Sequence, residues 1–180
     1  MIKKYFFRPS VKTLAVTSIM IALEVVLHRF VGIQTPILQL NFGFLPIAAI
    51  AMLHGPVYSG FAWAVADILG MLIFPSGGGW YFGFTVSALI MGIIYGVFIF
   101  GVHKAPRRTR IIRISAAVLT IVVFITFALD MFWLHLYWGN AFSVLIIPRL
   151  IKCAVMLPLQ IAVILGLAEL ISKLEKNLKL

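Results

Sequence analysis

The sequence predicts an all-α integral membrane protein: a single domain over residues 1–180, with six transmembrane helices and both termini in the cytoplasm. Hydrophobic residues make up 63% of the 180 residues and charged residues 11%, whereas soluble domains average roughly 45–50% and about 25%. At roughly 20 residues per spanning helix, the chain has room for about six spans and little else. Lipid offers no hydrogen bonds to the backbone, and no ten-residue alternating pattern occurs, so helices are expected rather than a barrel.

Six apolar stretches, separated by glycine, proline or polar residues, give the expected helices. The first is longer than the roughly 7–15 apolar residues of a signal peptide, so it is expected to be retained. The second is short because Gly55 and Pro56 interrupt it, and it is expected to be tilted or partly re-entrant. The expected spans are residues 11–31, 42–54, 57–74, 80–102, 111–134 and 143–171.

The positive charges predict the orientation of the chain. Twelve of the 15 Lys and Arg residues lie in the amino-terminal segment up to Lys12, in the connection from the fourth span to the start of the fifth up to Arg113, or in the carboxyl-terminal tail. The opposite loops, at residues 32–41, 75–79 and 135–142, contain none. Short cytoplasmic loops carry the excess of Lys and Arg, so both termini should face the cytoplasm. The net charge of +10 therefore indicates topology and attraction to anionic lipid, and nucleic acid is not an expected partner.

The sequence offers no support for catalysis, for a cofactor or for a metal site. Cys153 is the single cysteine, and neither a nucleotide-binding GxxxxGK[ST] motif nor an HExxH or GxSxG motif occurs. No internal repeat marks a self-sufficient transporter, so a transport function would need an outside source of energy. Two alternatives stay open: a proton-coupled carrier that uses Asp67 and the histidines, and a membrane enzyme that acts on lipid.

Three cations lie near the outward ends of the first and sixth spans, where the orientation rule gives no reason for them. Arg29, Arg149 and Lys152 have a similar depth and could share an outer pocket for an anionic solute, since arginine grips carboxylates through two hydrogen bonds. Alternatively, each side chain could extend to lipid headgroups or be neutralised within the protein, for example by Asp130.

Asp67 lies in the middle of the third span, where a carboxylate costs roughly 2.5–3.5 kcal/mol on insertion scales. It therefore needs a partner, a water-filled cavity or a proton. Its two oxygens could accept two parallel N–H bonds from an amino-pyrimidine edge, or it could make a structural hydrogen bond to a neighbouring helix. Glu24 in the first span is expected to bind a neighbouring helix rather than a ligand.

Aromatic side chains are frequent at the outer side. They include Trp80, Tyr81 and Phe82 beside the third loop, and Trp133 and Trp138 near the fifth. Such residues form interfacial belts in many membrane proteins, but together they could also stack on a planar heterocycle. The glycine run at residues 77–79 would let the adjoining loop fold over that ligand as a lid.

Small residues recur at a spacing of four, which lets helices approach closely. Most of these faces should pack inside the bundle. They are Ser18 and Ala22 in the first span, Ala62, Ala66 and Gly70 in the third, and Gly92 and Gly96 in the fourth.

Three segments carry a family resemblance: residues 32–46 (GIQTPILQLNFGFLP), residues 66–75 (ADILGMLIFP) and residues 83–87 (GFTVS). With them, the chain resembles the folate-family substrate-binding subunit, or S component, of energy-coupling factor vitamin transporters. The resemblance implies a six-helix S-component bundle with an outward pocket for folate, in the plasma membrane of a prokaryote. It also implies two kinds of partner: a transmembrane coupling subunit and two cytoplasmic ATPases.

The resemblance assigns roles to particular residues. The docking motif of the family falls on Ser18 and Ala22, and its gating loops fall on residues 32–41 and 75–80. For folate, the aromatic residues would stack on the pterin, and Asp67, Gln34 or Asn41 would read its pyrimidine edge. The glutamate carboxylates would bind Arg29, Arg149 or Lys152. The residues expected to bind substrate are therefore Arg29, Gln34, Asn41, Asp67, Trp80, Tyr81, Phe82, Trp138, Arg149 and Lys152.

Overall fold

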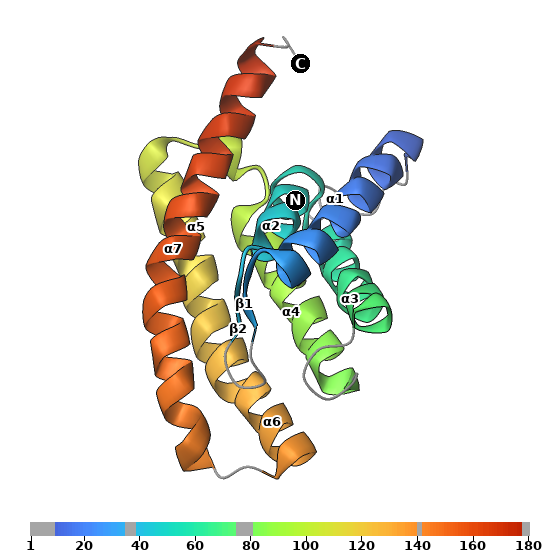
Figure 1. Cartoon of the computed structure of the whole chain (residues 1–180). Helices are drawn as coiled ribbons and strands as arrows, with labels where there is room; N and C mark the ends of the chain where they lie inside the picture. The colour runs from blue at the N-terminus through green and yellow to red at the C-terminus, as the bar shows by residue number, and fades with distance from the viewer. Residues whose placement is uncertain (1–9, 35–38, 75–80, 140–141, 178–180) are drawn as a thin grey trace.

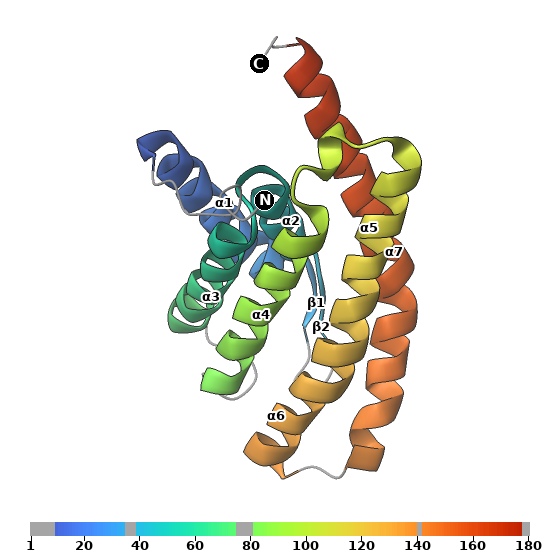
Figure 2. The ribbon, with the colours of Figure 1, turned by 180° about the vertical axis from the view of Figure 1, so that it is seen from behind.

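The computed structural model describes residues 10–34, 39–74, 81–139 and 142–177. Its helices form two groups that stand side by side (Figures 1 and 2). One group contains α1 (Val11–Phe30), α2 (Phe44–His54), α3 (Pro56–Ile73) and α4 (Phe82–Ile99). The other pairs α7 (Phe142–Asn177) with one long rod, built from α5 (Arg107–Thr120), the π-helix η3 (Ile121–Leu129) and α6 (Asp130–Trp138). A 3-10 turn, η2 (Val102–Lys104), joins the two groups.

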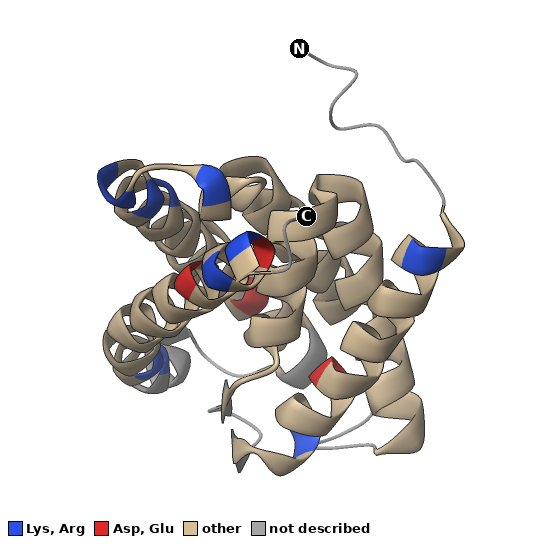
Figure 3. Ribbon diagram, turned by 90° about the horizontal axis from the view of Figure 1, so that it is seen from above, with Lys and Arg blue, Asp and Glu red and all other residues tan. Residues whose placement is uncertain are grey.

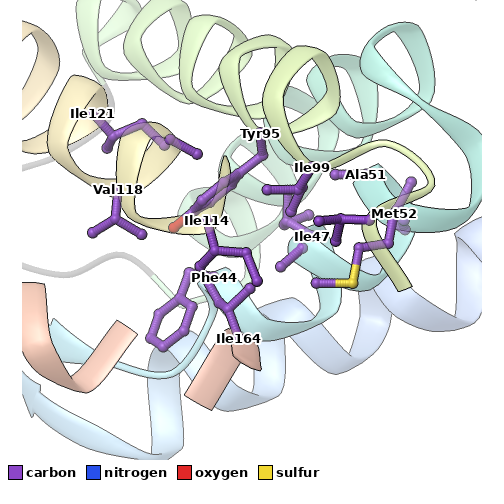
Figure 4. Close-up of a cluster of buried hydrophobic side chains, with 14 of the residues drawn as sticks. Phe44, Ile47, Ala51, Met52, Tyr95, Ile99, Ile114, Val118, Ile121 and Ile164 are labelled. Atoms are coloured by element: carbon purple, nitrogen blue, oxygen red, sulfur yellow. The ribbon is translucent and has the colours of Figure 1, made fainter. Parts of the chain in front are cut away.

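The core forms around α2, where the two groups meet. Because α2 is apolar on almost every side, it is buried along most of its length, and only Leu53 near its end is exposed. Its side chains Phe44, Ile47 and Met52 lie among Ile99 of α4 and Ile164 of α7 (Figure 4). Eleven residues of helix rise only about 16 Å, roughly half of a bilayer's hydrocarbon core. This is the short second stretch that the sequence predicted.

The connection between α1 and α2 corrects the all-α prediction. Strands β1 (Gly32–Gln34) and β2 (Gln39–Asn41) pair as an antiparallel hairpin, with Gly32 opposite Asn41. The hairpin continues from α2 toward the end of the bundle that carries α6 (Figure 1). Three-residue strands are too short to show an alternating pattern, for which at least four residues are needed, so the sequence could not reveal them.

Helices α3 and α4 pack closely through small residues, as expected. Ser59 donates a hydrogen bond from Oγ to the carbonyl oxygen of Gly92, at 2.7 Å. A Cβ atom at Gly92 would overlap the backbone of Ser59, and one at Gly96 would overlap Pro56. On α3 itself, Ala62 and the other small residues at the four-residue spacing are buried.

Within the described residues, five helical segments are long and apolar enough to cross a membrane, and α2 is a shorter apolar helix. The multi-pass membrane character is therefore confirmed, whereas the count of six spans and the orientation of the termini stay predictions. The rod 107–138 and helix α7 are longer than the predicted spans 111–134 and 143–171. The starts of α1 and α5 and the end of α7, which bear most of the described Lys and Arg residues, lie at one end of the bundle (Figures 1 and 3).

Candidate functional site

Charged side chains from four helices meet toward the opposite end. Asp67 of α3 interacts electrostatically with Arg29 of α1 and with Asp130 at the start of α6. Lys152 of α7 interacts with Asp130 and Arg149. Of the three cations that the sequence suggested as a group, Arg149 and Lys152 lie together beside Asp130, and, among the described contacts, Arg29 is linked to them only through Asp67. The structure also places two carboxylates among them, so the site is a mixed cluster rather than a purely cationic one.

Arg149 and Asp130 form a buried ion pair across α7 and α6. The Arg149 Nη1 and Asp130 Oδ2 atoms are 3.6 Å apart, and the two side chains are 7% and 13% exposed. The expected neutralisation of Arg149 by Asp130 is therefore confirmed. The Arg149 Nε group is buried and has no hydrogen-bond partner among the described residues. Buried donors nearly always have an acceptor. The Arg149 Nε group could therefore donate to an acceptor on a bound ligand.

Arg29 lies against α3 at Gly70. A Cβ atom built on Gly70 would be 3.3 Å from both Nε and Nη2 of Arg29. The guanidinium also interacts electrostatically with Asp67 and Glu24. Gly70 follows Asp67 by three residues, on the same face of α3. The absent side chain at position 70 therefore gives Arg29 room to lie beside Asp67, inside the bundle.

Asp67 is held by a residue that the sequence analysis did not select. Thr85 of α4 donates a hydrogen bond from Oγ1 to Asp67 Oδ2, at 2.7 Å. This is the expected structural bond to a neighbouring helix, and it uses one carboxylate oxygen. Two residues further on, the Ser87 hydroxyl is buried without a hydrogen-bond partner in the described part of the chain. The GFTVS segment carried the resemblance, so its hydroxyls were a signal that could have been used.

Glu24 and His28 of α1 lie against Gly43, beside Asn41, just before α2. His28 Nδ1 donates to Glu24 Oε1 at 3.0 Å within α1, and Glu24 is 1% exposed, so its bond to a neighbouring helix stays a prediction. The side-chain oxygen of Asn41 accepts a hydrogen bond from the backbone N–H of Gly43, at 3.1 Å. A Cβ at Gly43 would be 2.9 Å from Glu24 Oε1. Asn41 thus has a structural function here, with its amide N–H groups left for other acceptors.

An aromatic cluster adjoins the charged residues. Tyr81 lies 5.9 Å from Trp133 and 6.0 Å from Phe84, measured between ring centres. The indole N–H of Trp133 is buried and without a partner among the described residues. The sequence pattern indicated Trp133 only as an outer aromatic residue, and the structure places it in this cluster beside Tyr81. Phe82, by contrast, is 65% exposed, as expected of a residue in an interfacial belt.

Several predicted features lie outside the described residues: all of the second gating loop at residues 75–80, with its glycine run and Trp80, and residues 35–38 of the first gating loop. The side chains of Gln34 and Trp138 also lie outside the described part, although their backbones belong to β1 and α6. Within the described ranges, no group of three or more His, Cys, Asp or Glu side chains could hold a metal ion.

Replacing Gly83 by alanine is expected to disturb the aromatic cluster. The added Cβ would be 2.5 Å from Trp133 and 2.6 Å from Tyr81, both ring atoms, so the rings must move. Overpacking of this kind costs about 1–3 kcal/mol. Thermal unfolding in detergent should show the loss, together with a changed Trp133 emission. The control is Gly166→Ala on α7, where nothing lies within 4 Å, so stability should stay equal or rise. Equal melting temperatures for the two variants would contradict the expected packing.

Comparisons with known proteins agree with this arrangement. Residues 12–168 match the family model described as "ECF transporter, substrate-specific component". The chain is 41% identical, over 87% of both proteins, to the folate transporter FolT of Clostridium novyi (strain NT). It is 31% identical to the folate transporter FolT of Leuconostoc mesenteroides subsp. mesenteroides, over 81% of this chain and 78% of that one.

A solved structure is similar over nearly its whole length. The crystal structure of FolT bound with folic acid has a TM-score of 0.81 and 33% sequence identity, covering 91% of this chain and 98% of that chain. These matches confirm the resemblance that residues 32–46, 66–75 and 83–87 indicated. The family and the named relatives are transport components, which confirms the prediction that the chain is not an enzyme.

Proposed function

Because the chain belongs to the family of substrate-specific components of ECF transporters, we propose that it captures folate at the outer face of a prokaryotic plasma membrane. It delivers the vitamin inward when it is coupled to a transmembrane subunit and two cytoplasmic ATPases. The observation that carries the proposal is the similarity to the FolT protein crystallised with folic acid, which extends over 98% of the FolT chain. The mixed charged and aromatic cluster supports it, because folate combines a planar heterocycle with carboxylates.

Each part of folate has chemically matched side chains in the cluster. The pterin presents an amino group and a ring N–H side by side, which a carboxylate such as Asp67 can accept as a pair. Tyr81 and Trp133 offer ring faces for stacking on the heterocycle. The glutamate carboxylates have Arg29, Arg149 and Lys152 as counter-charges. Arg149 contributes its unpartnered Nε group, so a ligand carboxylate would complete its hydrogen bonding.

Saturable quenching of tryptophan fluorescence by folate tests the proposal. The purified protein alone, in detergent, is titrated with folate while the emission of its tryptophans is followed, with thiamine and riboflavin as controls. We expect one-to-one quenching by folate only, because Trp133 lies in the cluster. In proteoliposomes without a partner, the protein should bind folate and not accumulate it. Accumulation would favour the self-sufficient proton-coupled carrier, and absence of any response would overturn the folate assignment.

Helix α1 is proposed as the docking surface for the coupling subunit. Ser18 and Ala22 are both exposed, one helical turn apart, and apolar neighbours such as Ile19 and Leu23 are exposed beside them. Small side chains at this spacing let a partner helix approach closely. The surface therefore has the chemistry of a helix contact within the membrane.

Ala22→Leu is expected to impair transport while leaving folate binding by the isolated subunit unchanged. Overpacking at a close helix contact costs about 1–3 kcal/mol, so complex formation should weaken by at least about fivefold. Folate uptake and co-purification of the ATPases measure this. Ala162→Leu, at an exposed alanine of α7, is the matched control and should leave uptake at the wild-type level. If both variants transport equally well, the docking surface lies elsewhere.

A further inference from the structure

A second site lies at the cation-rich end of the bundle, between η2 and the last turns of α7. Here the structure contains a cavity of about 370 Å³. Its polar lining consists of His103, Lys104, Arg110, Ser172, Glu175 and Lys176. Nothing in the folate cluster reaches this end, and the capture of folate makes no use of it. Figure 3 shows the beginning of α5 and the end of α7 as neighbouring groups of Lys and Arg.

The one carboxylate in the lining is already engaged. Glu175 Oε1 lies 2.8 Å from Lys104 Nζ, and Glu175 Oε2 lies 3.5 Å from His103 Nε2. These contacts fasten the end of α7 to η2. With Glu175 matched to Lys104, the charges of Arg110 and Lys176 have no acidic counterpart in the lining, so the cavity is electropositive.

One buried donor in the lining faces no acceptor. The Arg110 guanidinium is fixed by Nη2, which donates to the carbonyl oxygens of His103 at 2.8 Å and Ala105 at 3.3 Å. Its Nε group is nevertheless buried without a hydrogen-bond partner in the described residues. A buried guanidinium N–H group normally has an acceptor, so Arg110 Nε indicates a ligand with acceptor oxygens.

We propose that this cavity binds a phosphate group. A phosphate carries several acceptor oxygens and at least one negative charge, so it can accept from Arg110 Nε, from the Ser172 hydroxyl and from Lys176 together. The site lies at an end of a membrane protein, where the phosphate of an anionic phospholipid headgroup is within reach. Inorganic phosphate and soluble phosphomonoesters have the same chemistry. The occupant would link η2 to the end of α7 in the way that Glu175 already does.

Binding of short-chain phosphatidylglycerol to the purified protein tests the proposal. The lipid is titrated at about 0.5 M salt, where the Debye length is only a few ångströms and general surface attraction is weak. Short-chain phosphatidylcholine and inorganic phosphate are titrated in parallel. We expect saturable binding of one phosphatidylglycerol per protein, in the presence and in the absence of folate. Competition by inorganic phosphate at similar concentrations would identify a soluble phosphate as the ligand, and binding of neither would overturn the proposal.

Variants separate the cavity from the surrounding charge. Arg110→Gln and Lys176→Gln should each weaken phosphatidylglycerol binding by about fivefold or more. Arg108→Gln and Lys173→Gln remove the same charge at exposed positions outside the lining, and should change it by less than about twofold. Equal losses of phosphatidylglycerol affinity in all four variants would contradict specific binding in the cavity. Lys176 is exposed, so its replacement leaves the fold intact even if Arg110→Gln does not. Folate quenching should be unchanged in each variant. A negative result for phosphatidylglycerol binding would then leave the proposed folate binding unaffected.

Discussion

Replacing Arg149 by alanine should both destabilise the protein and abolish high-affinity folate binding. The substitution leaves the buried Asp130 without its ion-pair partner. Removing one member of a buried pair costs about 3–5 kcal/mol, the largest stability effect expected in this chain. Folate would also lose a charge-assisted contact to its glutamate, so its affinity should fall by at least about tenfold. Thermal unfolding in detergent and tryptophan quenching measure the two effects separately.

The Arg149→Ala, Asp130→Asn double variant distinguishes a binding role from a structural one. With the Asp130 carboxylate neutralised, the charge that Arg149 balanced is gone, and part of the lost stability should return. Folate binding should not return, because the ligand contact of Arg149 is still missing. Recovery of both properties would show that Arg149 serves only the fold. The further combination with Arg29→Ala should reduce affinity again, and an unchanged affinity in that variant would contradict the assignment of these arginines to the glutamate.

Asp67→Asn should weaken folate binding by about a hundredfold or more while preserving the shape of the side chain. An amide offers one acceptor where a carboxylate offers two, so it cannot receive both N–H groups of the pyrimidine edge. The loss of one hydrogen bond to a charged group, at about 1.5–3 kcal/mol, and the weakening of the other from a charged to a neutral acceptor give this magnitude. Titration of folate against the variant measures it, and wild-type affinity would exclude Asp67 from the binding site.

Thr85→Val examines the residue that positions Asp67. Its hydroxyl donates to Asp67 Oδ2, so the valine variant should bind folate more weakly by about tenfold. The matched control is Thr120→Val, since the Thr120 hydroxyl bonds only to the Ala116 carbonyl of its own helix in the described contacts. That variant should bind folate as the wild type does. A similar loss in both would indicate a general effect of removing hydroxyl groups from membrane helices.

The sequence was most informative where a single physical constraint acts on the chain. Lipid forces apolar helices, so the spans could be recognised, and the cost of burying charge predicted that Asp67 needs a partner, a water-filled cavity or a proton. The positions of the cation-rich segments at one end of the bundle follow from the same reasoning.

The features that were missed depend on contacts between distant segments. Thr85 became a partner of Asp67 only through the packing of α4 on α3, and Trp133 joined Tyr81 only through the approach of α6 to α4. Neither contact can be predicted from the periodicity of apolar residues in the sequence. The hairpin of β1 and β2 was missed because its strands have three residues each. The π-helical form of η3 was missed as well, since its nine residues are as apolar as any α-helical span.

The π-helix η3 makes the geometry of the cluster dependent on chain length. It lies directly before Asp130 and Trp133, and π-helical segments close their hydrogen bonds over five residues rather than four. One residue of helix corresponds to a turn of about 100°. A deletion of one residue within η3 would therefore rotate Asp130 and Trp133 together away from Arg149 and Tyr81, although no side chain of the cluster had been replaced. Insertions and deletions in this apolar stretch, more than point substitutions, are thus the changes by which related chains could acquire a different ligand.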